Sequence, residues 1–176
     1  MALYVPDRYF SRVSNIDVAR DLIGAGYTSV LLDVDNTLLT RDEHHVPVDV
    51  RAWLGKVTRS GVNVCLLSNN FHQNVVDLAQ NLGLPIVSKA MKPLPHGYLL
   101  ACRKIGARRK QTVMVGDQLT TDILGAQMLG MGAYLVCPLV EADLRHTLVL
   151  RNVENLFIGD REPEGAATAS CETSHS

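Results

Sequence analysis

The sequence predicts an α/β domain built around a mostly parallel sheet of five strands. Short apolar runs alternate with amphipathic segments along most of the 176 residues, as expected when strands and helices pack in layers. Glycine follows several of the amphipathic segments, where it commonly ends a helix. A chain of this length buries one sizeable core, and two domains would be crowded.

The predicted elements follow one another in regular order. Ser14 with Asp17 is a plausible N-terminal cap for the first helix, and Pro47 opens the second. The polar tail over residues 159–176 is predicted to be disordered, which leaves 1–158 as the folded domain. Helices are expected over residues 16–23, 47–59, 73–82, 94–105, 121–129 and 141–150, and strands over 28–33, 62–68, 85–88, 112–116 and 132–136.

Composition argues against several classes of protein. Lys plus Arg total 17 against 18 for Asp plus Glu, a net charge of −1, so we expect no nucleic acid partner and no general attraction to membranes. The basic residues at 103–104 and 108–110 are interpreted as solvated surface. The chain has neither a secretory signal nor an apolar run of the ~20 residues that span a membrane. We therefore predict a cytoplasmic protein, with no structural zinc because its four cysteines form no CxxC pair.

The N-terminal segment has two interpretations. The stretch Leu3-Tyr4-Val5-Pro6 with Tyr9-Phe10, close to Arg8 and Arg12, could dip into a membrane surface. The alternative, which we favour, is that the segment packs across the domain's own core.

Polar residues end three of the predicted strands. The first ends in Asp33-Val-Asp35-Asn-Thr37, the second in Ser68-Asn69-Asn70, and the fourth in Gly116-Asp117 with Asp122 following. Lys92-Pro93 lies in the loop after the third strand. Open α/β sheets bind ligands beyond the carboxyl ends of their strands, so these residues are expected to share one site.

The carboxylates suit metal-assisted cleavage of a phosphate ester. Mg²⁺ prefers carboxylate ligands, which Asp33 and Asp117 would supply, with Asp122 as a further candidate. Aspartate is an established nucleophile that forms an aspartyl-phosphate, and Asp35 is placed to act as general acid and base.

The remaining polar residues are candidates for holding the phosphoryl group. Ser68 offers a hydroxyl donor and Lys92 a positive charge, and Thr37 and Asn69 are further candidate contacts. Each of these short motifs taken alone is more often a solvated loop. Their order and their position after buried strands favour the functional interpretation, because two carboxylates after an apolar run need compensating partners.

These strings resemble the four motifs of the haloacid dehalogenase superfamily: LLDVDNTLL, LLSNN, Lys92-Pro93 and MVGDQLTTD. From about Leu22 to Val136 they are similar to the YqeG-type group of subclass IIIA phosphatases. The resemblance implies a three-layer Rossmann-like fold and a Mg²⁺ cofactor. It implies that Asp33 is the nucleophile and a metal ligand, and that Asp35 is the general acid/base whose backbone carbonyl also binds the metal. Ser68 and Lys92 would hold the phosphoryl group and Asp117 would complete the metal site, while direct contact of Asp122 with the metal stays open.

The intervals between the motifs leave no room for a cap domain. Between Asp35 and Ser68 there is space for a helix and a strand, and between Ser68 and Lys92 for a helix and a short strand. Residues 39–46, with His44 and His45, are predicted to form a flap at the mouth of the site. An uncapped site admits bulky as well as small phosphate esters.

The substrate remains open among several alternatives. The YqeG-type group is similar to fungal mitochondrial phosphatases acting on phosphatidylglycerophosphate, so this resemblance implies a phospholipid substrate and peripheral membrane contact. A soluble sugar or nucleotide phosphatase is the alternative within the same chemistry. A regulatory binding protein does not need the intact set Asp33, Asp35, Lys92 and Asp117, and a dehalogenase does not need metal ligands.

Overall fold

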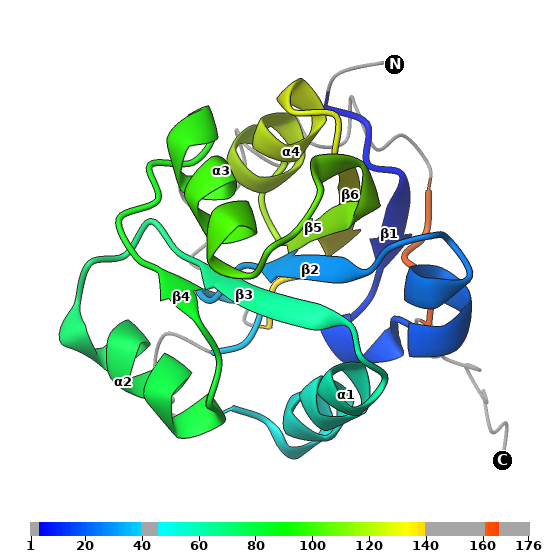
Figure 1. The fold of residues 1–176 in the computed structure, drawn as a ribbon. Coiled ribbons are helices and arrows are strands. Elements are labelled where there is room, and N and C mark those ends of the chain that lie inside the picture. Colours follow the sequence, from blue (N-terminus) through cyan, green and yellow to red (C-terminus); the bar gives the residue numbers. More distant parts are fainter. Residues whose placement is uncertain (1–3, 40–45, 140–160, 166–176) are drawn as a thin grey trace, which may run out of the picture.

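The computed structural model describes residues 4–39, 46–139 and 161–165, and it contains a parallel sheet of six strands in the order β1-β6-β5-β2-β3-β4 (Figure 1). Every pair of neighbouring strands in the sheet is parallel, which confirms the predicted α/β class. The strands are β1 (Arg8–Phe10), β2 (Ser29–Leu32), β3 (Asn63–Leu67), β4 (Ile86–Val87), β5 (Thr112–Gly116) and β6 (Gly132–Val136).

Strand β1 corrects the predicted strand count. It pairs with β6, with Arg8 opposite Tyr134, and Phe10 is fully buried. A three-residue strand with one inward apolar side chain is too short to produce a periodic signal. In the part of the N-terminal segment that the structure describes, Phe10 thus packs on the domain's own core, the interpretation that the sequence favoured.

Helices cover both faces of the sheet, which gives the three layers. The helices are α1 (Val48–Arg59), α2 (Gln73–Leu82), α3 (Pro95–Lys104) and α4 (Leu124–Met128). Figure 1 shows α1 and α2 on one side of the sheet and α3 and α4 on the other. Val30 and Leu32 of β2 belong to the apolar cluster beneath α1 and α2, whereas Leu31 belongs to the cluster beneath α3 and α4. This alternation explains why β2 is apolar at successive positions: both of its faces are buried.

Two of the predicted helices are interrupted by π-helical turns. The first consists of a 3-10 turn at Val13–Asn15 and a π-helical segment, η2 (Val18–Ile23), and the helix predicted over 121–129 consists of η4 (Leu119–Ile123) followed by α4. Each π-helical segment carries a fully buried aspartate, Asp21 in η2 and Asp122 in η4. Such turns are frequent at functional positions. The helix predicted over 141–150 lies outside the described residues.

Five residues beyond the predicted domain boundary have a described place. Glu164 lies against β1, where its backbone N–H donates to Tyr9 at 2.8 Å and its carbonyl accepts from Ser11 at 2.9 Å. The boundary at residue 158 and the disorder of the tail stay predictions.

The order of the strands places a site between β2 and β5. The chain runs from β2 to β3 and β4 on one side and then returns to β5 on the other side of β2. Ligands bind beyond the carboxyl ends of strands at such a reversal. Within the described ranges, α1 is the helix between β2 and β3 and α2 the helix between β3 and β4, so these intervals contain no cap domain there.

Candidate active site

Three carboxylates meet at the carboxyl edge of the sheet. Asp33 directly follows β2, Asp117 directly follows β5, and Asp122 lies in η4. One side-chain oxygen from each lies within 4.8 Å of the others. The structure therefore brings together the three side chains that the sequence singled out as metal ligands.

Lys92 bridges two of these carboxylates. Its ammonium donates to Oδ1 of Asp33 and, at 2.7 Å, to Oδ1 of Asp122, with its side chain 3% exposed. The backbone of Lys92 is fixed by Asn69, whose Oδ1 accepts from the Lys92 N–H at 2.7 Å and whose Nδ2 donates to the Lys92 carbonyl at 3.1 Å. Asn69 thus positions Lys92, while its predicted contact with phosphate stays a prediction.

This cluster is short of positive charge. Burial raises the pKa of Asp33 to about 7, with Asp122 and Asp35 adding to the effect and Lys92 opposing it. Burial and the charges of Asp33 and Asp122 raise the pKa of Asp117 to about 8. Burial lowers the pKa of the Lys92 ammonium, but the charges of Asp122 and Asp33 outweigh burial and leave that pKa raised. Among the described residues, one cation, Lys92, is paired with this group of three carboxylates, through Asp33 and Asp122.

Asp122 is anchored on both of its oxygens. Oδ1 accepts from Lys92, and Oδ2 accepts from the backbone N–H of Gln118 at 3.1 Å. A Cβ atom on Gly116 would lie 2.2 Å from Asp122 Oδ2, so this strand end has room for the carboxylate because residue 116 has no side chain. Asp122 holds Lys92 in place, a role that the sequence alone did not reveal.

Asp117 has an unsatisfied oxygen. Its Oδ1 is buried and has no hydrogen-bond partner among the described residues. A buried acceptor without a partner costs free energy, and a divalent cation would satisfy it. Carboxylate oxygens of Asp33 and Asp117 are the donors that Mg²⁺ prefers, so the residues present fit such an ion.

Asp35 is oriented by the loop that follows β3. Its Oδ2 accepts from Ser68 Oγ at 3.1 Å and its Oδ1 from Asn70 Nδ2 at 3.4 Å, while the Asn70 N–H donates to Ser68 Oγ at 2.9 Å. The turn that carries Asp35 depends on Asn36, which adopts a φ of 60°, a conformation that asparagine tolerates. The sequence analysis named no role for Asn70; its place beside Ser68 and Asn69 was the available signal.

Thr37 also faces the nucleophile candidate. Its Oγ1 donates to Asp33 Oδ2 at 3.3 Å, and the residue is buried. The contacts predicted for Thr37, Ser68 and Lys92 with a phosphoryl group stay predictions. The predicted flap lies largely in residues 40–45, including His44 and His45, outside the described residues.

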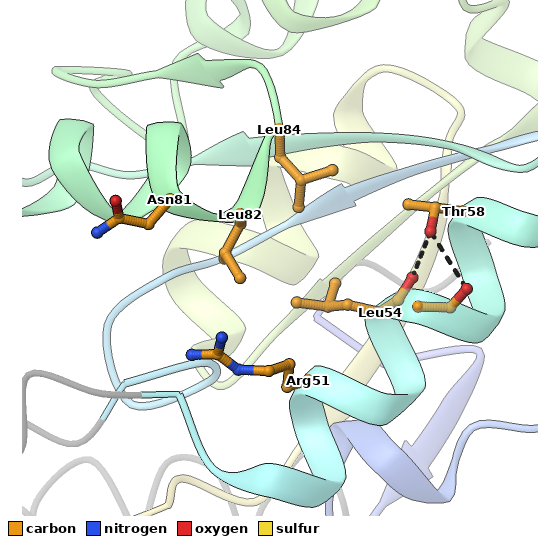
Figure 2. A pocket seen from close by; sticks show the side chains of 7 residues that line it. Arg51, Leu54, Thr58, Asn81, Leu82 and Leu84 are labelled. Atoms are coloured by element: carbon orange, nitrogen blue, oxygen red, sulfur yellow. Dashed lines mark hydrogen bonds between the residues drawn. The ribbon is translucent and has the colours of Figure 1, made fainter.

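A hollow lies between α1 and α2, apart from the carboxylate cluster (Figure 2). Its volume is about 240 Å³, and it lies near the ends of helices that precede β3 and β4, toward the amino edge of the sheet. It offers no carboxylate, so it is separate from the site described above. Its lining residues are Arg51, Leu54, Gly55, Thr58, Asn81, Leu82 and Leu84.

Comparisons with known proteins agree with this geometry. Residues 8–130 match the haloacid dehalogenase-like hydrolase family. The chain is 28% identical to the probable phosphatase YqeG of Bacillus subtilis over 162 residues, covering 92% of this chain and 94% of that protein.

Solved structures share the fold. A haloacid dehalogenase phosphatase from Thermococcus onnurineus superposes with a TM-score of 0.54 at 18% identity, over 70% of this chain and 98% of that one. The cobalt-bound deoxy-D-mannose-octulosonate 8-phosphate phosphatase of Haemophilus influenzae gives 0.51 at 14% identity, over 76% and 88%. The chain therefore belongs to the haloacid dehalogenase-like hydrolases, and among them it is similar to the probable phosphatase YqeG.

Proposed function

We propose that the protein is a Mg²⁺-dependent phosphomonoesterase that forms an aspartyl-phosphate on Asp33. The observation that carries this proposal is the imbalance of charge at the carboxyl edge of the sheet. Among the described residues, Lys92 is the one cation ion-paired with this cluster; it pairs with Asp33 and Asp122, and one oxygen of Asp117 has no partner. A structural cluster would be expected to contain matched charges.

The metal site would be formed by the side chains of Asp33 and Asp117, together with the backbone carbonyl of Asp35 that the family resemblance implies. When bound, Mg²⁺ would neutralise carboxylate and phosphate charge and so lower the repulsion between nucleophile and substrate. Asp122, with both oxygens already engaged, would orient Lys92.

The chemistry proceeds in two displacements. An oxygen of Asp33 attacks phosphorus, the bond from phosphorus to the alcohol oxygen breaks, and Asp35 donates a proton to that oxygen. Water then attacks the phosphorus of the aspartyl-phosphate, Asp35 accepts the proton from water, and inorganic phosphate leaves with Asp33 restored. Lys92 and Ser68 donate to the phosphoryl oxygens as charge moves onto them.

The role of Asp35 has its own test. Its hydrogen bonds with Ser68 and Asn70 align it without the need for substrate. Asp35→Asn is expected to slow turnover by on the order of 10², measured as steady-state phosphate release. An unchanged rate would move the acid and base roles to another residue.

The substrate that we propose is a phospholipid bearing a terminal phosphate, phosphatidylglycerophosphate in particular. Resemblance to the YqeG-type group supports it, and the absence of a cap from the described intervals allows a bulky headgroup to enter. A soluble sugar or nucleotide phosphate is the alternative that uses the same chemistry.

The decisive experiment measures phosphate release by the full-length protein. Phosphatidylglycerophosphate in detergent micelles is compared with a panel of soluble phosphate esters, with Mg²⁺ and with EDTA. Preference for the lipid, dependence on Mg²⁺ and loss in Asp33→Asn are expected. Preference for a soluble ester would discard the lipid substrate and keep the chemistry, whereas indifference to EDTA would remove the metal. Folded, metal-loaded protein that hydrolyses nothing would favour a regulatory binding protein.

A further inference from the structure

Three large apolar side chains in the loops next to the candidate active site are exposed. Phe71 is 65% exposed, Met91 55% and Leu94 55%. We call these three residues the apolar rim. Phe71 follows Ser68-Asn69-Asn70 in the chain, and Met91 and Leu94 flank Lys92 and Pro93, so the rim belongs to the loops that carry candidate phosphate-binding residues.

The two loops of the rim are bonded to each other. The Lys89 N–H donates to the Asn70 carbonyl at 3.3 Å, and the amide of Asn69 is paired with the backbone of Lys92. The Leu94 N–H closes a turn onto the Met91 carbonyl at 2.8 Å. The rim is therefore fixed relative to Lys92, and anything that binds the rim is held at the mouth of the site.

The part of the chain that carries Met91 and Leu94 has one sign of charge. Residues 78–116 contain no Asp or Glu and seven Lys or Arg, although the whole chain has a net charge of −1. The Lys89 ammonium lies 5.8 Å from the centre of the Phe71 ring, so a cation accompanies the rim itself. Lys89 and the buried Lys92 lie in the rim loops, whereas the other five lie at the end of α3 and before β5, at the amino edge of the sheet. These five are Arg103, Lys104, Arg108, Arg109 and Lys110, all exposed.

Apolar side chains next to an exposed cation such as Lys89 suit an anionic lipid interface, where the apolar groups enter the acyl boundary and the cation meets headgroups. A stable protein partner usually covers roughly 800 Å² on each side, which is more than three side chains on two loops provide. In the described part of the N-terminal segment, Phe10 is buried and Arg8 and Arg12 are paired with Asp21 and Asp49, so these residues offer no competing contact.

We propose that the apolar rim and Lys89 dock the active site onto an anionic phospholipid surface. In this orientation headgroup phosphates face Asp33, and the acyl chains stay in the bilayer. What the site does there rests on the proposed phosphatase function, whereas the docking itself does not. No helix among the described residues has the length and apolar character to cross a membrane, so the contact that we propose is with the surface.

Vesicle flotation with the full chain tests the proposal. The vesicles contain phosphatidylcholine with or without about a third phosphatidylglycerol. Phe71→Ser combined with Leu94→Ser removes two rim side chains, and Leu94 is an N-cap position at which serine is favoured. The matched control is Ile23→Ser combined with Met128→Ser, because both residues are exposed but lie in η2 and α4, away from the rim.

We expect wild type and the control pair to float with anionic vesicles, and the rim pair to bind at least about tenfold more weakly. Lys89→Glu should also weaken binding, and added salt should weaken binding of the wild type. Asp33→Asn, which is inactive by the proposed function, should bind vesicles like wild type, so that failure of catalysis and failure of docking are distinguished.

Absence of wild-type binding to vesicles, or an equal loss of binding in the rim and control pairs, would overturn the proposal. Rim-dependent self-association in sedimentation velocity without vesicle binding would assign the rim to a second copy of the chain instead.

Discussion

Two buried aspartates in π-helical segments have opposite environments. Asp21 in η2 accepts from both of its neighbouring arginines, from Arg8 on Oδ1 and from Arg20 at 2.6 Å on Oδ1 and 3.1 Å on Oδ2, and from the Asp17 N–H at 2.8 Å. Burial raises the pKa of Asp21, but the hydrogen bonds from Arg20 and Arg8 outweigh it and bring the pKa to about 2. Around Asp122 in η4 the ratio is reversed, with three carboxylates for one lysine in the part of the chain that the structure describes.

The difference separates a structural cluster from a functional one. Two cations and a backbone donor leave the oxygens of Asp21 satisfied, so the cluster needs nothing further. The Asp33 cluster keeps the pKa values of Asp33 and Asp117 raised and leaves one oxygen of Asp117 unpaired among the described residues. Raised carboxylate pKa values and a shortage of positive charge are typical of sites that bind a cationic ligand.

The largest expected effect comes from neutralising the nucleophile. Asp33→Asn is expected to lower turnover by on the order of 10⁴ or more, because an amide does not attack phosphorus as a carboxylate does. The measurement is phosphate release from a soluble ester under saturating Mg²⁺, with circular dichroism to check the fold. Residual activity near that of the wild type would remove Asp33 as nucleophile.

A methyl group at the end of β5 tests the anchoring of Asp122. Gly116→Ala places a Cβ 2.2 Å from Asp122 Oδ2, so Asp122 must move and Lys92 loses one of its two partners. We expect turnover to fall by about 10²-fold, as for other displacements of a positioned group. Gly55→Ala in α1 is the matched control, because its Cβ would meet only the flexible Arg59 side chain at 3.1 Å. Equal activity of the two variants would show that Asp122 does not position Lys92.

Breaking the balanced cluster should affect stability and leave the chemistry alone. Asp21→Asn removes the charge that pairs Arg8 and Arg20, and we expect the free energy of unfolding to fall by about 2 kcal/mol. Both arginines are partly exposed, which limits the loss through solvent screening. Urea unfolding measures it, and turnover of a soluble ester should stay within about twofold of wild type. A large loss of turnover in correctly folded Asp21→Asn would contradict the separation of the two clusters.

The smallest effect is a dependence of Mg²⁺ affinity on pH. Asp33 and Asp117 have pKa values of about 7 and about 8 in the folded protein, above those in the unfolded chain. Without metal, the folded protein therefore keeps Asp33 and Asp117 protonated at pH values where the unfolded chain would ionise them. The contribution of these two groups to stability is present at low pH and is lost as pH rises through their folded pKa values. Asp21 has the opposite sign: its contribution is present above the unfolded pKa and is lost as pH falls toward 2.

Because protons compete with the metal, Mg²⁺ should bind at least about tenfold more weakly at pH 6 than at pH 8. The rise in Tm on adding Mg²⁺ should be correspondingly larger at pH 8. Titration calorimetry at the two pH values measures the affinity directly. Equal affinities would mean that neither carboxylate is a ligand with a raised pKa.

The sequence was most informative where the structure depends on local pattern. The apolar runs of β2, β3 and β5 and the polar residues after them were predicted because both features lie within a few neighbouring positions. The bridge from Lys92 to Asp122 and the crowding between Gly116 and Asp122 were not predicted, since they depend on how η4 turns back toward β5. The ion pairs of Asp21 were not predicted either, because Arg8 lies in a strand that gives no periodic signal.

The pairing of the first strand with the last has a consequence for synthesis. Asp7 and Ala133 exchange hydrogen bonds across a separation of 126 residues, whereas Ser29 of β2 lies opposite Asn63 of β3. At about 5–20 residues per second, the ribosome completes β6 on the order of ten seconds after β1 emerges. Strands β2 and β3 can thus pair on the nascent chain before β6 is available to β1. The edge of the sheet formed by β1 is therefore completed last. In the finished protein, hydrogen exchange should accordingly release the amides of β1 before those of β2.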